Sequence, residues 1–297
     1  MGIVDWEAKD EILAGLYEAG FRWITYSVFW PDAEKEKGKY DFSSYEQIIN
    51  RSTKQGFKTA LVLSGGNPLY EQPDTSGSPY GKPMIEWVVP KSEEGRRALV
   101  RWFIETIRHF KGRGIIWTLF GEPEAIGLTP EEYCWFNAEV GKVIKKELPD
   151  EVLSGPTTAP AGVSGLPRTV TNPKYSEGII AAGCHKYWTH KDESLVLQFQ
   201  TYMWDAAPPE EAKEPLDQIR ELYAKHSPSG KTILMTTLGY PSQKDWVSGS
   251  EEKQAKMLAR TFLADLYIGA SVTFWYNHQD YEDYEEFTDE LIKYLRD

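Results

Sequence analysis

The stretch Ile115-Ile-Trp-Thr-Leu-Phe-Gly-Glu-Pro-Glu124 shows the unit from which this chain is built. Its first six residues form an apolar run of strand length, and a helical pattern follows from Pro130 to Leu148. The same succession of strand and helix recurs from one end of the sequence to the other. Alternating strands and helices are typical of a parallel sheet covered by helices, so we predict an α/β fold.

The number of strands decides between an open sheet and a closed barrel. A (β/α)8 TIM barrel needs a strand before the first helix, and only residues 1–5 are available for it. We therefore predict a (β/α)8 TIM barrel whose first strand is short or truncated. No linker or low-complexity segment interrupts the pattern, so residues 1–297 are expected to form a single domain. The other predicted strands are 21–29, 57–63, 115–120, 151–155, 195–199, 232–235 and 271–276, and a closing helix is predicted at 284–295.

Composition excludes several classes of partner. The net charge of -12 disfavours nucleic acid and anionic membranes. No signal-peptide pattern and no run of about 18 apolar residues occurs, so we expect a cytoplasmic protein, and we expect it to be a monomer. Two cysteines, Cys134 and Cys184, give no disulfide framework, and five scattered histidines give no metal cluster. No metal or cofactor is expected.

Several motifs occur in the order and at the spacing of one enzyme group. They are Trp30-Pro-Asp-Ala-Glu-Lys-Glu-Lys-Gly-Lys-Tyr-Asp-Phe42, Gly66-Asn-Pro-Leu-Tyr70, His109-Phe-Lys-Gly-Arg113, Gly239-Tyr-Pro-Ser242 and Phe274-Trp-Tyr276. Together they resemble the clan A retaining glycoside hydrolases, the group of cellulases, xylanases and β-xylosidases. The resemblance implies a TIM barrel, with Glu122 in the place of the acid/base glutamate at the end of the fourth strand.

The chain departs from this family at the strand ends that would build the active site. Thr237, in Ile233-Leu-Met-Thr-Thr-Leu-Gly-Tyr-Pro-Ser242, stands where the family has its nucleophilic glutamate. Changes confined to such positions favour a redesigned pocket over drift in a natural relative that lost activity. The other departures are Gly121 for asparagine, Gln200 for histidine, Ser64 for aspartate, and Asn277-His278 for aspartate and tryptophan.

With threonine and not glutamate at position 237, the retaining mechanism lacks its nucleophile. Retaining hydrolysis uses two carboxyl groups about 5–5.5 Å apart. The hydroxyl of Thr237 has no adjacent base in the sequence and does not readily form a glycosyl-enzyme bond. An inverting mechanism would need a second carboxylate at wider spacing. The loop carboxylates available for it are Glu71, Glu124, Asp205 and Asp280, each of which is expected on the solvated surface.

One carboxylate remains at the predicted mouth of the barrel, and a positioned carboxylate is an effective general base. Small residues beside Glu122, namely Gly121 and Ser64, would leave room for a substrate. Aromatic side chains could stack on a flat ligand: Tyr26, Phe120, Tyr202, Trp204 and Trp275. Ordinary packing is the alternative for each of these. Four polar side chains could donate a hydrogen bond to a developing oxyanion: Gln200, Thr237, Asn277 and His278.

This constellation resembles designed Kemp eliminases, in which one carboxylate removes a carbon-bound proton from a benzisoxazole. The leading hypothesis is therefore a designed lyase that acts on a small aromatic substrate, or binds its transition-state analogue, with Glu122 as base. The main alternative is an inactivated glycoside hydrolase, or a barrel that binds a sugar or an aromatic ligand without turnover. Weaker alternatives are a Schiff base at Lys58 and a hydrolytic pair of Ser27 or Ser64 with His278.

Overall fold

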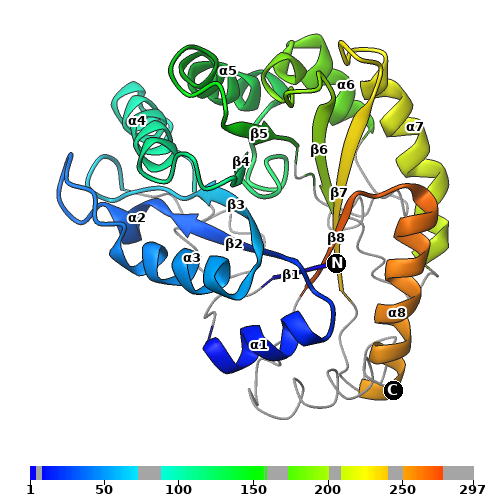
Figure 1. Ribbon diagram of the computed structural model, residues 1–297. Helices are drawn as coiled ribbons and strands as arrows, with labels where there is room; N and C mark the ends of the chain where they lie inside the picture. Colours follow the sequence, from blue (N-terminus) through cyan, green and yellow to red (C-terminus); the bar gives the residue numbers. More distant parts are fainter. Residues whose placement is uncertain are drawn as a thin grey trace.

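The computed structural model describes residues 1–4, 9–72, 88–156, 158, 173–200, 209–239 and 250–276. Four predicted site residues, Tyr202, Trp204, Asn277 and His278, lie outside these ranges, as does the predicted closing helix. Within the ranges, eight strands form one sheet in the order β5-β4-β3-β2-β1-β8-β7-β6, and every strand pairing is parallel (Figure 1). The strands are β1 Gly2–Val4, β2 Trp23–Phe29, β3 Lys58–Ser64, β4 Ile116–Leu119, β5 Val152–Ser154, β6 Leu195–Gln200, β7 Thr232–Leu238 and β8 Val272–Trp275.

The short first strand completes the ring. Gly2 pairs with Trp23 on β2 and with Phe274 on β8, so β1 lies between the second and the last strand and connects them in the sheet. Between β5 and β6 the ring is bridged by a hydrogen bond from the Gly155 amide to the Val196 carbonyl, 3.2 Å long, and by a parallel bridge beyond it. The fold is a nearly closed (β/α)8 barrel, which confirms the prediction and its short first strand.

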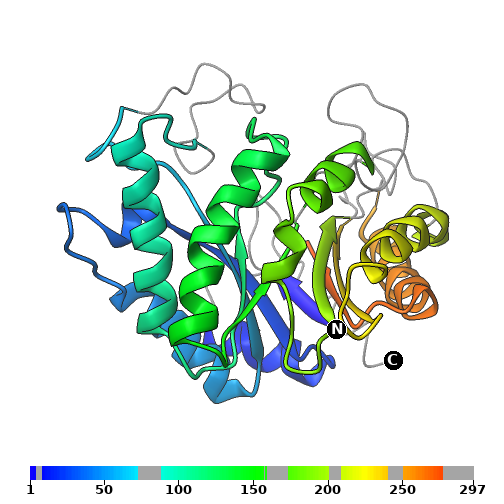
Figure 2. The ribbon, with the colours of Figure 1, turned by 90° about the horizontal axis from the view of Figure 1, so that it is seen from above.

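The helices surround this barrel (Figures 1 and 2). Several begin at side-chain caps that the sequence supplies. The Thr129 hydroxyl accepts a hydrogen bond from the Glu132 amide, and the Glu132 carboxylate accepts one from the Thr129 amide, which is a capping box at the start of α5. The helices are α1 Asp10–Glu18, α2 Trp30–Ala33, α3 Ser43–Gln55, α4 Glu93–His109, α5 Pro130–Glu147, α6 Pro173–Ala181, α7 Lys213–Ala224 and α8 Glu251–Ile268, with 3-10 helices η2 Cys184–Tyr187 and η3 Pro209–Ala212.

Alternation along each strand separates two buried layers. One layer fills the barrel itself and is made from strand residues; its buried members are Ala60, Val196, Met235, Val272 and Phe274. The other lies between the sheet and the helices and contains residues of both, such as Leu61 of β3 and Leu99 of α4. We call these the lumen side and the helix side of a strand. The side on which a residue falls decides whether it can reach a ligand at the barrel mouth.

In the ranges that the structure covers, no helix is both long and apolar enough to cross a membrane.

Candidate active site

The turn that carries Glu122 has an unusual backbone. Phe120 and Glu122 have φ angles of 59° and 47°, and among the described residues other than glycine only Glu193 shares this left-handed conformation. Such conformations are costly for residues with a side chain and gather at functional sites. Hydrogen bonds hold the turn on both sides. The Phe120 amide donates to the Leu63 carbonyl over 2.8 Å, and the Ala125 amide donates to the Glu122 carbonyl over 2.9 Å.

Gly121 has little around it within the described part of the chain. A Cβ atom built there would meet Val62 Cγ1 at 3.8 Å and no other described atom within 4 Å, so these residues leave room for a larger side chain than glycine. Val62 pairs with Thr118 in the register of β3 and β4. Glu122 itself is 8% exposed. The turn after β4 therefore carries a buried carboxylate at position 122 next to a position, 121, that has no side chain.

Thr237 occupies the lumen side at the end of β7. Its neighbour Thr236 donates a hydrogen bond to Asp265 of α8 over 2.5 Å, which places Thr236 on the helix side and Thr237 on the other. Thr237 pairs in register with Gln200 of β6 and Phe274 of β8. It is buried, and its hydroxyl has no hydrogen-bond partner among the described residues. Position 237 thus holds a hydroxyl that faces the barrel interior.

Ser64 and Gln200 end their strands at comparable positions. Ser64 is the last residue of β3, is buried, and pairs with Phe29 of β2. Gln200 is the last residue of β6. The structure therefore brings the strand ends of Ser64, Glu122, Gln200 and Thr237 to the same rim of the barrel, and their joint role in a site stays a prediction.

Three of the predicted stacking residues face the wrong way for that role. Tyr26 and Trp275 belong to the layer between the strands and the helices, and both are almost completely buried there. Phe120 packs at its edge against Phe103 of α4 and Phe136 of α5, with ring centroids 5.3 and 5.1 Å apart. These contacts are those of core packing. The expectation that the three rings line a binding site is therefore corrected.

A polar network that the sequence did not identify fills the lumen below the rim. The Thr118 hydroxyl donates to Gln198 Oε1 over 2.8 Å and lies 2.6 Å from the Ser154 hydroxyl. All three side chains are buried. They come from β4, β5 and β6, one layer inside the strand ends. The alternate polar residues of these strands were the signal that could have revealed the lumen side.

A second buried carboxylate has a structural role. Glu34, 1% exposed, accepts hydrogen bonds from the Trp30 indole, the Tyr70 hydroxyl and the Gly38 amide, at 2.5, 2.5 and 2.6 Å. The Asn67 side-chain amide also donates to the Glu34 carbonyl. These donors join the loops after β2 and β3. Burial and the hydrogen bond to Glu34 both raise the pKa of the Tyr70 hydroxyl, which therefore remains a donor. Trp30, Glu34 and Gly38 of the Trp30–Phe42 motif therefore have a structural role in this network.

Of the loop carboxylates considered for an inverting mechanism, Glu71 and Glu124 lie within the described residues, and both are partly buried and not on the solvated surface expected for them. Glu71 accepts hydrogen bonds from the backbone amides of Lys91 and Ser92, so it fixes the start of α4. Glu124 follows Glu122 in the same turn, and Asp205 and Asp280 lie outside the described residues. Across the part of the chain that is described, no group of three or more histidine, cysteine or acidic residues could hold a metal ion.

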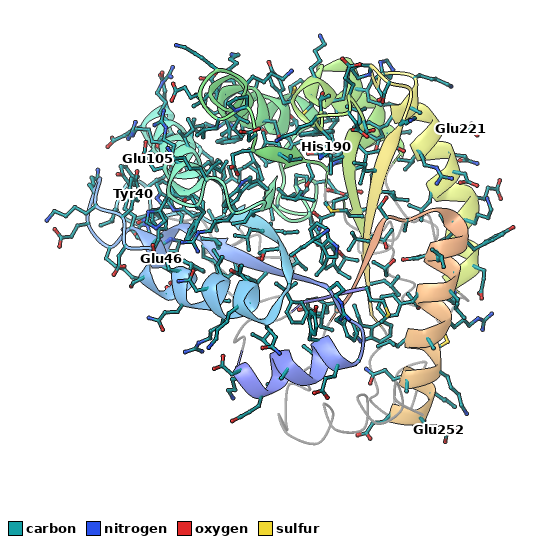
Figure 3. The ribbon with its side chains drawn as sticks, in the orientation of Figure 1. Tyr40, Glu46, Glu105, His190, Glu221 and Glu252 are labelled. Carbon is teal, nitrogen blue, oxygen red and sulfur yellow. The ribbon has the colours of Figure 1, made fainter. Side chains whose placement is uncertain are left out.

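Two surface grooves lie on the outer helices. The groove of about 590 Å³ includes Tyr40, Glu46 and Glu105, which gather beside α3 and α4 in Figure 3. The other, of about 560 Å³, follows α7 and includes Glu221. Neither groove is lined by a predicted site residue. The candidate site therefore depends on the strand ends and not on these grooves.

Comparison with known proteins gives the fold a context. No protein-family model matches the chain, and no curated protein matches it. Among solved structures, a family 39 glycoside hydrolase from Bacteroides cellulosilyticus WH2 is 21% identical with a TM-score of 0.71, covering 97% of this chain and 58% of its own. A glucosidase from Croceicoccus marinus is 12% identical with a TM-score of 0.67, covering 99% of this chain and 66% of its own.

A family 39 glycoside hydrolase enzyme from Xanthomonas axonopodis pv. citri is also similar, at 15% identity and a TM-score of 0.65, with 94% of this chain and 58% of its own covered. The chain thus spans about three fifths of the length of these neighbours. At such identities the likeness supports the TIM-barrel fold and nothing beyond the fold.

Proposed function

We propose that this protein is a barrel enzyme in which Glu122 acts alone as the acid–base residue, abstracting a carbon-bound proton from a small substrate. The observation that carries the proposal is the left-handed turn from Phe120 to Glu122 at the end of β4. Strain of this kind persists where the surrounding structure enforces it, and it is common at reactive sites.

The other strand ends support a reaction with one carboxylate. Thr237 places a hydroxyl where retaining hydrolysis would need a second carboxylate. A hydroxyl at that position can donate a hydrogen bond to an oxygen that gains charge when Glu122 takes a proton. The open volume beside Gly121 gives a substrate room next to the base.

The expectation of a flat aromatic substrate is the part of the hypothesis that needs the largest revision. Tyr26, Phe120 and Trp275 are turned toward the helices, so a flat aromatic substrate loses three of its five expected stacking partners. A Kemp-type elimination remains the suitable test reaction because it requires only a base and a donor to the leaving oxygen. The same role for Glu122 holds whether the pocket was designed or arose by loss in a natural lineage.

The second candidate is a barrel that binds a sugar without hydrolysing it. Its support is the likeness to glycoside hydrolases, together with the replacement of the nucleophile by Thr237. Gly121, where that family has an asparagine, weakens this candidate because a polar side chain that would meet the sugar is missing.

One set of assays separates the two candidates. Purified protein is incubated with 5-nitrobenzisoxazole and, separately, with an aryl xyloside and an aryl glucoside. Glu122→Gln should lower kcat/KM for elimination by about 10²–10⁴-fold, the usual contribution of a positioned base. Glu124→Gln, a change of equal charge in the same turn, is the matched control and should retain most of the rate.

Elimination that is equal in Glu122→Gln and the parent protein would remove the base assignment. Binding of a xyloside or glucoside without any elimination would favour the sugar-binding barrel. Thr237→Glu provides a further distinction, because glycosidase activity in that variant would mean that only the nucleophile separates this chain from a hydrolase.

A further inference from the structure

The two cysteines, 50 positions apart in the sequence, meet at the contact between α5 and η2. Cys134 lies in the first turns of α5, and Cys184 begins η2. The Cys134 S–H donates a hydrogen bond over 3.1 Å to the carbonyl of Ala182, two residues before Cys184, and each thiol shifts the pKa of the other. Both are free thiols and both are buried. Spacing in the sequence gave no indication of this pairing.

The rest of the contact fixes the two thiols in place. One face of α5 meets the segment around η2 at each turn. The Asn137 side chain accepts a hydrogen bond from the Trp188 indole over 2.9 Å, and the Lys145 ammonium donates to the Lys186 carbonyl over 2.6 Å. Between them, the Tyr187 ring packs directly on Gly141, where a Cβ atom would come within 2.5 Å of the ring. The contact therefore extends from the thiol pair along α5 toward the C-terminal end of the helix.

The two thiols differ in a way that suits two-step oxidation. The hydrogen bond from the Cys184 thiol lowers the pKa of Cys134, and the Lys186 charge adds to this effect. Burial raises the pKa of Cys184, so it stays protonated as the donor. Cys134 is 7% exposed and Cys184 is fully buried. A thiolate is the reactive form of cysteine, so Cys134 is the thiol expected to react first.

We propose that Cys134 and Cys184 form an oxidative modification site, in which a hydroperoxide converts the thiol pair into an intramolecular disulfide. This goes beyond the proposed role of Glu122 and does not depend on it. The Cys134 thiolate attacks one peroxide oxygen; the O–O bond breaks, and a proton taken up by the leaving oxygen makes it water or an alcohol.

The resulting sulfenic acid at Cys134 is then attacked by the Cys184 sulfur. The S–O bond breaks, the hydroxyl group leaves as water with the proton of the Cys184 thiol, and the S–S bond forms. Over both steps two thiols and one hydroperoxide give one disulfide and two molecules of water, or one water and one alcohol. The peroxide is reduced by the two electrons that the sulfurs lose.

The local backbone allows the segment that carries Cys184 to move toward Cys134. Gly183, immediately before Cys184, has a φ of 80°, and η2 is a single short 3-10 turn. A short segment that begins at a left-handed glycine moves more readily than a long helix. The disulfide would close a loop from α5 to η2 that contains β5 and α6.

The experiment uses the full chain after reduction and removal of reductant. Hydrogen peroxide is added, remaining peroxide is removed, and free thiols are counted under denaturing conditions with Ellman's reagent. We expect the count to fall from two to none per chain while the protein stays monomeric on a non-reducing gel. The intact mass should fall by two hydrogen atoms, and a thiol reductant should restore both thiols.

Single variants test the assigned order. Cys184→Ser should leave Cys134 as a sulfenic acid that dimedone traps, whereas Cys134→Ser should show little dimedone labelling at Cys184. Retention of both thiols in the parent protein, disulfide-linked dimers, or stable sulfinic acid in place of the disulfide would each overturn the proposal. The measurement on the parent protein decides the matter even if a variant fails to fold.

Discussion

Glu34 and Glu122 are both buried carboxylates beyond the ends of barrel strands, but their surroundings differ. Glu34 accepts three hydrogen bonds from residues of two loops and ties those loops together. Glu122 lies on a turn whose backbone adopts a left-handed conformation next to an open glycine position. The first arrangement stabilises the fold, whereas the second holds one side chain in place at a cost. The difference teaches that burial alone does not identify a reactive carboxylate.

The largest effect on stability should come from breaking the Glu34 network. In Glu34→Gln, one carboxylate oxygen becomes an amide that cannot accept from its donor. A stranded buried donor costs about 1–3 kcal/mol, so we expect a loss of that size in the free energy of unfolding. Urea denaturation measures it. Glu36→Gln, an exposed surface change two residues away, is the control and should leave the unfolding midpoint unchanged.

The lumen network offers a second comparison with the Glu122 turn. Thr118→Val keeps the shape of the side chain but removes the hydroxyl that joins Ser154 and Gln198. We expect a loss of about 1–2 kcal/mol in unfolding free energy, because two buried polar groups lose a partner. The exposed Thr53→Val in α3 is the matched control. Equal stabilities for the two variants would contradict the role given to this network.

Asp265 is a third buried carboxyl group, and we expect its charged form to lower the free energy of unfolding. Burial raises its pKa above the ordinary 3.8, although the Thr236 and Thr273 hydroxyls oppose this shift. The folded protein thus holds the proton more tightly than the unfolded chain, and stability falls as pH rises from about 4 through the folded-state pKa. Asp265→Asn removes this dependence.

The unfolding free energy of Asp265→Asn minus that of the parent protein should therefore increase from pH 4 to pH 7. Denaturation at several pH values, with both proteins in the same buffers, gives the difference directly. A difference that stays constant or decreases with pH would contradict the assigned shift.

The smallest effect is expected at Gly121. Among the described residues a methyl group there would meet only Val62, and a substitution that disturbs no packing usually stays within about 0.5 kcal/mol. Gly121→Ala should therefore unfold at nearly the same denaturant concentration as the parent. Gly155→Ala is the contrasting control, because a Cβ atom there would come within 2.5 Å of Trp188. A large loss in Gly121→Ala would mean that the turn needs glycine for its backbone.

The sequence predicted the barrel and its short first strand, and the roles it assigned to Glu122 and Thr237 stay predictions. It did not show which strand side chains point into the barrel and which point toward the helices. Parallel strands are apolar on both faces, so hydropathy alone did not show that Tyr26 faces the helices. The polar residues Thr25 and Ser27 on either side of it were an available signal. For Phe120 no signal existed, because its direction depends on a left-handed backbone angle.

The most direct test compares Glu34 and Glu122 in one assay. Elimination of 5-nitrobenzisoxazole is measured for Glu34→Gln and Glu122→Gln, with each rate divided by the folded fraction in the same buffer. Glu122→Gln should remain folded and lose about 10²–10⁴-fold in kcat/KM, whereas Glu34→Gln should lose stability and keep its rate per folded molecule. The opposite result, with the rate lost in folded Glu34→Gln and kept in Glu122→Gln, would contradict the assignment of Glu122 as the base.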